Sequence, residues 1–137
     1  MGDEKSEAMA FVRDNTTSHV STVHEGAPCA RVMSVGKLDD DLHLWYATFR
    51  NSNKVRQIAE CPKVCVTICA QHRDMRVFGT AIIHDDEEKR HSLWKDELQQ
   101  YFPGGKDDPE YVVMEVLPDK AEYRDFEKYG MAMKRVI

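Results

Sequence analysis

Short segments rich in β-branched and aromatic residues recur along the whole chain, at intervals of about 8 to 14 residues. Turn-forming residues separate them, as in the run Glu25-Gly26-Ala27-Pro28 between the first two segments. The expected strands cover residues 19–24, 30–35, 42–48, 64–69, 76–83, 111–117 and 120–125. Strands joined by such short turns pair antiparallel, so the pattern predicts an antiparallel β-barrel rather than a doubly wound parallel sheet.

Three helices are expected between these strands. A leading helix covers residues 3–14, and a helix of about two turns begins at Ser52, a good N-cap, and ends before Pro62. A longer helix follows the four carboxylates at residues 85–88, which suit the positive end of a helix. The apolar side of the leading helix consists of Ala8, Met9, Phe11 and Val12. The predicted buried side of the long helix consists of Trp94, Leu98 and Tyr101.

One domain accounts for all 137 residues: the leading helix, a barrel from about 18 to 126, and a polar tail. Its 19 Lys and Arg residues against 24 Asp and Glu residues give a formal charge of -5, which lacks the positive field that nucleic acids require. The longest apolar stretch, residues 64–70, covers about a third of a bilayer, and the amino end is acidic and polar. We therefore expect a soluble, cytoplasmic protein with neither a nucleic-acid nor a membrane partner.

The cysteines and histidines give no metal-binding pattern. Cys61, Cys65 and Cys69 lie in or next to a β-branched segment, where residues four apart are separated by roughly 13 Å along a strand. That distance is too large for one shared ion, so free thiols packed as small buried hydrophobes are expected. The six histidines form no paired motif on a helix. The sequence thus predicts no metal site.

A candidate anion site lies where the third strand runs through a polar turn into a helix. Ser52, Asn53 and Lys54 begin that helix, so free amide N–H groups, a hydroxyl and an ammonium group converge there. Arg31, on a neighbouring strand, could add a second cation. In the alternative interpretation, Ser52 is only a helix cap, and Lys54 and Arg56 only form a solvated face. The residues alone leave both interpretations open.

The same residues resemble those of a known family, the FMN-binding split β-barrel proteins related to pyridoxamine 5′-phosphate oxidase, and in particular its small general-stress branch. The resemblance covers about residues 18 to 126. It rests on the order and spacing of three motifs: Arg31-x-Met33, then Tyr46-x-Thr48-(x)₃-Ser52-x-Lys54, then Tyr101-Phe102-Pro103-Gly104-Gly105 leading to Asp107-Asp108-Pro109-Glu110-Tyr111-Val112-Val113.

The resemblance implies a set of FMN-binding residues. Arg31, Ser52 and Lys54 would hold the FMN phosphate, and Asn53 stands where relatives often carry arginine. The flavin ring would lie against the main chain of Val32, Met33, Ser34, Ala47 and Thr48.

The resemblance also implies a homodimer whose flavin site is completed by the partner subunit. Met75 stands about where the oxidase has a polar glutamine, and Arg124 stands where relatives often carry tryptophan. If the last strand reaches the neighbouring flavin, Arg124 contributes a positive charge there. Otherwise it is a solvated strand residue that pairs with Glu122 or Asp125.

The function implied is that of a flavoprotein whose FMN exchanges a hydride or electrons with a small molecule or a nicotinamide donor. No side chain stands out as an acid, base or nucleophile, so no catalytic residue is assigned. The chain ends without the arginine and histidine pattern that the oxidase uses for its substrate, so true pyridoxamine-phosphate oxidase activity is not expected. Two alternatives stay open: a flavin-binding or sensor protein without turnover, and a relative that uses deazaflavin or haem.

Overall fold

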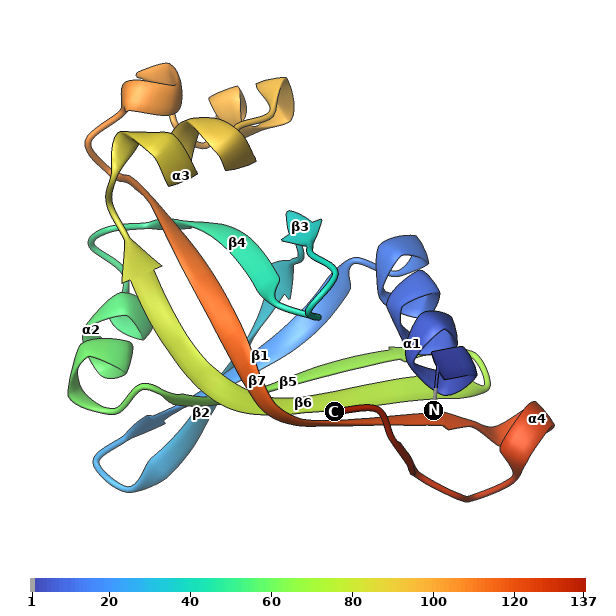
Figure 1. Ribbon diagram of the computed structural model, residues 1–137. Helices are drawn as coiled ribbons and strands as arrows, with labels where there is room; N and C mark the ends of the chain where they lie inside the picture. Colours follow the sequence, from blue (N-terminus) through green and yellow to red (C-terminus); the bar gives the residue numbers. More distant parts are fainter. Residues whose placement is uncertain (1) are drawn as a thin grey trace.

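The computed structural model describes residues 2–137, which form one antiparallel sheet curled into a barrel, with helices around it (Figure 1). The strands are β1 (Thr17–His24), β2 (Ala27–Ser34), β3 (Lys37–Leu38), β4 (Leu44–Phe49), β5 (Lys63–Ala70), β6 (Arg73–His84), β7 (Tyr111–Asp125) and β8 (Lys134–Arg135). The helices are α1 (Gly2–Asp14), α2 (Asn53–Glu60), α3 (Glu87–Leu93) and α4 (Phe126–Tyr129), with 3₁₀ turns η1 (Asp96–Gln100) and η2 (Gly105–Asp107). The predicted fold class is confirmed.

The order of the strands is β2-β1-β5-β6-β7-β4-β3, and β8 adds to β7. β2 therefore lies at one end of the sheet and the β4–β3 pair at the other. Inward-facing residues of the strands form one core with α1, and they include Val20, Tyr46, Val66 and Met75. β2 and β4 carry six of the residues that the resemblance assigns to FMN, and the other three, Ser52, Asn53 and Lys54, lie at the start of α2.

The helices begin and end close to the expected residues, with one exception. The Ser52 hydroxyl accepts a hydrogen bond from the Val55 amide and caps α2, as predicted. The helix expected after residues 85–88 ends at Leu93, because Trp94 is extended and the chain continues as separate 3₁₀ turns. Trp94 and Leu98 pack beside the buried Phe102 and Tyr111, but Tyr101 is 56% exposed. The prediction that Tyr101 lies on a buried face is wrong.

Several strand boundaries also differ from expectation. β2 and β6 each begin three residues earlier than expected. Leu42 lies in a turn with φ 65°, so the third expected strand begins only at Leu44. The last two expected strands form the single strand β7, whose register with β6 shifts at Gly79. A Cβ atom on Gly79 would lie 2.3 Å from the Leu117 carbonyl oxygen, so the close approach of β7 requires glycine there. Asp119 is the extra residue of this bulge, and the strand continues past Pro118 without a break.

All four cysteines are free, as expected, but the prediction that they are buried is wrong: Cys61 and Cys65 are half-buried and Cys69 is exposed. Val64, Val66 and Ile68 occupy the inward positions of β5 instead. The residues after 126, expected as a polar tail, form α4 and β8. Over residues 2–137, no helix has the length and apolar character needed to cross a membrane.

Candidate functional site

A pocket of about 370 Å³ lies where the two ends of the sheet face each other. β2 supplies one strand wall and β4 the other, and the segment from α3 to Phe102 supplies the third wall. The strand walls consist of Val32, Met33, Ser34, Val35, Gly36, Ala47, Thr48 and Phe49. Its volume falls within the range of about 300 to 1,000 Å³ that small-molecule sites have.

The two strand walls offer main-chain groups as well as side chains. β2 has a neighbour on one side only, and β3 pairs with β4 only at Leu44 and Trp45. In the described part of the chain, the outer edge of β2 therefore has no strand partner. The pocket-facing edge of β4 likewise has none at Ala47 and Thr48. Unpaired edge N–H and C=O groups are available to a polar ligand.

The structure brings most of the predicted site residues to this pocket. Those that line it are Val32, Met33, Ser34, Ala47, Thr48 and Lys54. The Met33 side chain is turned into the core and is 9% exposed, so this residue presents its main chain to the pocket. Arg31, Ser52 and Asn53 do not line the pocket and lie beside it on β2 and at the start of α2.

Lys54 is the cation that reaches the pocket from α2. Its Nζ donates a hydrogen bond to Thr48 Oγ1 at 2.9 Å. Burial lowers the pKa of the Lys54 ammonium, and the positive charge of Arg31 lowers it further. Within residues 2–137, neither Lys54 nor Arg31 forms an ion pair with a carboxylate. Two neighbouring cations without an anion are typical of a site for an anionic ligand.

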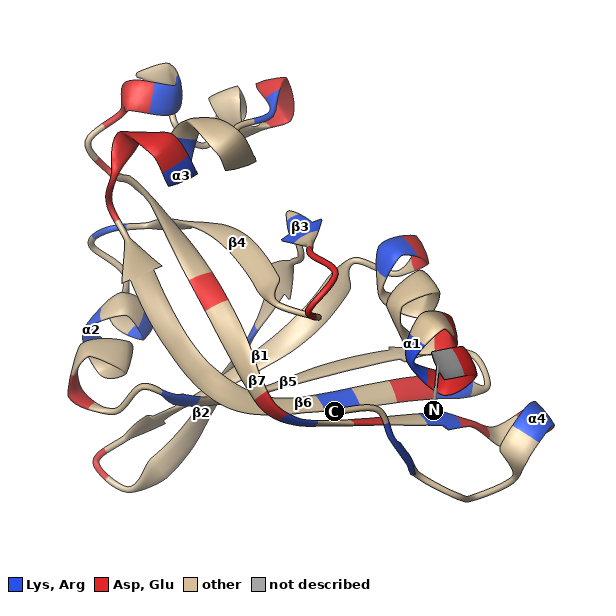
Figure 2. Ribbon diagram, in the orientation of Figure 1, with Lys and Arg blue, Asp and Glu red and all other residues tan. Residues whose placement is uncertain are grey.

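Arg31 is held in place by a hydrogen-bond network between β1, β2 and α2. Its guanidinium donates to the Val20 carbonyl at 3.1 Å, to Thr22 Oγ1 at 2.9 Å and to Gln57 Oε1 at 3.1 Å. Thr22 in turn donates to the same Gln57 oxygen at 2.6 Å. The network fixes the Arg31 charge against α2, which also carries Lys54. Figure 2 shows basic residues in blue on α2.

The remaining predicted phosphate ligands have other roles in this structure. The Ser52 oxygen accepts the capping hydrogen bond described above. The Asn53 side-chain oxygen accepts a hydrogen bond from Arg56, which also donates to Asn51 at 3.0 Å. Ser52 as a cap and Arg56 on an exposed face agree with the alternative interpretation, whereas the half-buried Lys54 does not.

The third wall of the pocket was missed by the sequence analysis. It consists of Leu93, Lys95, Glu97, Leu98, Tyr101 and Phe102. Lys95 ties this wall to the strands, because its Nζ donates to the Gly36 carbonyl at 2.9 Å. The Tyr101-Phe102-Pro103 motif could have indicated this wall. It was used as part of the family resemblance but was not assigned to the site.

The two positions expected to reach a partner's flavin differ in exposure. Met75 is 1% exposed and belongs to the core, so its side chain cannot extend from the surface of this chain. Arg124 donates to both carboxylate oxygens of Asp74, each at 3.0 Å, and lies over the Phe126 ring. Asp74 is directly opposite Arg124 on β6. The predicted pairing with Glu122 or Asp125 is therefore wrong: Asp125 lies on the opposite face of the strand, and Glu122 pairs with Arg76.

Several known proteins are similar to this chain. The family model described as pyridoxamine 5′-phosphate oxidase like matches residues 3–136. General stress protein 26 from Bacillus anthracis is 26% identical, with a TM-score of 0.78 over 87% of this chain and 92% of that one. A protein from Clostridium acetobutylicum related to general stress protein 26 is 21% identical, with a TM-score of 0.83 over 98% and 95% of the two chains.

A third similar structure is described as a pyridoxamine 5′-phosphate oxidase-related, FMN binding protein from Nostoc punctiforme. It is 16% identical, with a TM-score of 0.77 over 94% of this chain and 86% of that one. At this identity, the likeness establishes a shared fold. A comparison with curated protein sequences gives no match.

Proposed function

The chain belongs to the pyridoxamine 5′-phosphate oxidase-like family, and from this premise we propose that it is a flavoprotein that binds FMN between the ends of its sheet. The observation that carries the proposal is the pair Arg31 and Lys54, two cations without a carboxylate partner beside a pocket of fitting size. The FMN-binding relative from Nostoc punctiforme supports the choice of ligand.

The residues present fit the chemical parts of FMN. Lys54 and Arg31 would hold the phosphate as charge-assisted hydrogen-bond donors, and the start of α2 adds its amide N–H groups. The free edges of β2 and β4 would hold the polar edge of the flavin ring through their main chain. Val32, Ala47 and Phe102 provide apolar surface for the ring.

Bound FMN would supply hydride or electron transfer with a small molecule, such as a nicotinamide donor. The protein's part is to bind, orient and shield that cofactor. Leu93, Leu98 and Phe102 exclude water from the inner side of the pocket. We assign no acid, base or nucleophile to the pocket, in line with the sequence analysis.

A titration with two flavins tests the proposal. We expect the protein to bind FMN more tightly than riboflavin, because only FMN carries a phosphate for Arg31 and Lys54. The measurement is quenching of flavin fluorescence, and the absorption spectrum of the purified protein identifies deazaflavin or haem if either is the resident group. Equal affinity for FMN and riboflavin would contradict the phosphate assignment.

A second experiment tests turnover. A nicotinamide donor should bleach the bound flavin, and air should restore its colour. If the flavin stays oxidised, the chain is a flavin-binding protein without turnover.

We also propose that two copies of the chain form a homodimer around the flavin site. Val32 and Phe49 line the pocket and are 61% and 40% exposed, so the pocket has apolar residues open to solvent at its rim. A second copy would cover them and complete the site. Sedimentation at micromolar concentration should give about twice the chain mass of 15.8 kDa. A monomer that still binds FMN tightly would contradict the shared site.

A further inference from the structure

A second group of polar side chains lies on the barrel wall outside the flavin pocket. Glu115 of β7 is a buried carboxylate that accepts contacts from two histidines. His43 Nδ1 lies 2.7 Å from Glu115 Oε2, and His84 Nε2 lies 2.8 Å from Glu115 Oε1. Their side chains are 27% and 17% exposed, respectively. None of these three residues lines the flavin pocket, so the proposed function does not use them.

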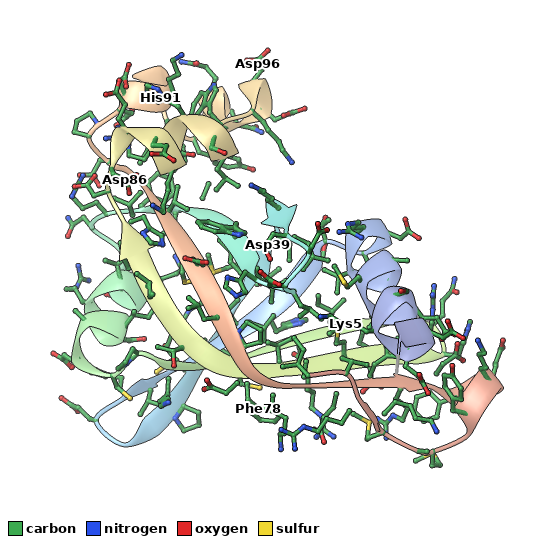
Figure 3. The ribbon with its side chains drawn as sticks, in the orientation of Figure 1. Lys5, Asp39, Phe78, Asp86, His91 and Asp96 are labelled. Carbon is green, nitrogen blue, oxygen red and sulfur yellow. The ribbon has the colours of Figure 1, made fainter. Side chains whose placement is uncertain are left out.

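Asp39 completes the group from the turn between β3 and β4 (Figure 3). Its Oδ1 accepts hydrogen bonds from the amides of Asp41 at 3.1 Å and His43 at 2.9 Å. These bonds fix the carboxylate, so that Oδ2 lies 3.8 Å from His43 Nδ1 and 3.2 Å from Trp45 Nε1.

We propose that Asp39, His43 and Glu115 form a binding site for a divalent transition metal of the zinc class. One donor atom from each of the three residues lies within 4.8 Å of the other two. Two donors on a tetrahedral zinc ion are about 3.4 Å apart, since each bond is about 2.1 Å long. The separations of 2.7 and 3.8 Å around His43 Nδ1 lie on either side of that value, so the Glu115 oxygen must move away by about 0.7 Å and the Asp39 oxygen closer by about 0.4 Å to admit the ion.

The donor set selects the class of metal. An imidazole nitrogen with carboxylate oxygens suits zinc and its first-row neighbours, whereas magnesium and calcium prefer oxygen ligands alone. Three protein ligands leave a fourth position for water. His84 is a positioning residue, because its contact with Oε1 orients the Glu115 carboxylate toward the other two ligands. The ion would link the β3–β4 turn to β7, and its ligands come from elements too far apart in sequence to form a motif.

Trp45 provides a reporter beside the site. Its indole donates to Asp39, and its ring stacks on His84 with centroids 5.6 Å apart. The chain has two tryptophans, so Trp94→Phe leaves Trp45 as the sole one. In that variant, Co²⁺ at the site should quench the fluorescence of Trp45, and Zn²⁺ should displace the Co²⁺ and restore it. This measurement leaves all three ligands unchanged, so it does not depend on a ligand variant folding.

Measuring zinc binding by the full chain tests the proposal. The protein is first stripped of metals by a chelator, and its FMN content is the same in every sample. Titration calorimetry with Zn²⁺ should give one ion per chain, and Mg²⁺ should not compete. His43→Ala and Glu115→Gln should each weaken Zn²⁺ binding by at least about 10-fold. Circular dichroism of each variant checks that it is folded, and His43→Ala is the safer one because His43 is partly exposed.

The matched control is His91→Ala. His91 lies with Glu87 and Asp107 in a second group of metal-binding residue types, whose carboxylate side chains are 80% and 70% exposed. We expect this variant to bind Zn²⁺ like the unchanged protein. The proposal is overturned if His43→Ala keeps full affinity, if His91→Ala loses it, if Mg²⁺ competes equally, or if Co²⁺ leaves Trp45 unquenched. These measurements report zinc binding whether or not the protein binds FMN. Failure of the metal site can therefore be distinguished from failure of the proposed function.

Discussion

Replacing Arg31 and Lys54 together by methionine should weaken FMN binding by roughly 10²- to 10⁴-fold and leave riboflavin binding almost unchanged. A hydrogen bond to a charged group contributes about 1.5 to 3 kcal/mol, and about 1.4 kcal/mol corresponds to a tenfold change in affinity. Lys54→Ala alone should therefore cost roughly 10- to 150-fold. Methionine keeps an unbranched chain and removes the charge at both positions, so the apolar stems of the two side chains keep most of their packing.

The control for this experiment is Arg56→Met. Arg56 lies on α2 near Lys54, but its guanidinium is occupied by Asn51 and Asn53 on the exposed side. Its removal should change FMN affinity little. Fluorescence titration of each variant with both flavins gives the comparison. If the double variant lost FMN and riboflavin affinity equally, the cations would support the fold of the pocket and not the phosphate.

The pH dependence of FMN binding follows from the same residue. Burial and the Arg31 charge lower the pKa of Lys54 in the free protein, and a phosphate beside it would raise that pKa again. Between the two pKa values, the FMN complex holds more protons than the free protein. FMN affinity should therefore fall as the pH rises through this window. In Lys54→Met the fall should be absent, which ties the effect to this ammonium group.

The sequence predicted the strands well because alternation along a strand is a local property. β5 shows this, since Val64, Val66 and Ile68 are buried as their spacing indicates. The ends of the strands were less predictable where contacts with residues far apart in the sequence determine them. β7 continues through Pro118 because its bulge meets Gly79 of β6, and no local pattern reports that contact. Leu42 was placed in a strand because it is apolar, whereas the Asp39 turn gives it a positive φ.

The candidate site was predictable where one continuous motif carries it. Thr48 and Lys54 lie six residues apart and are joined by a hydrogen bond, so the strand-to-helix motif was sufficient to find them. Lys95 and Tyr101 escaped, because a periodic helix was expected where the chain breaks at Trp94. Glu115 and His43 lie 72 residues apart and meet only because β4 and β7 are neighbours in the sheet. No spacing rule for metal ligands covers such a separation.

Phe11→Ala should lower the free energy of unfolding by about 3 to 5 kcal/mol, a large part of the roughly 5 to 15 kcal/mol typical of a domain. The residue pattern predicts only a weak apolar side for α1, yet Ala8, Phe11 and Val12 are fully buried. The Phe11 ring packs 6.0 Å from the Tyr123 ring, and the Arg73 guanidinium lies 4.8 Å from its centre. The substitution leaves a cavity between α1 and the sheet and removes both contacts.

Urea unfolding followed by circular dichroism measures this loss. Phe126→Ala is the matched control, because Phe126 is 40% exposed and its loss should cost much less than that of Phe11. An α1 that is a loose appendage would give a cost below about 1 kcal/mol for Phe11→Ala, similar to the control. A cost near the expected value would instead make α1 part of the cooperative core. Isolated helices of this length are marginal in water, so the barrel beneath Phe11 is what stabilises α1 as a helix.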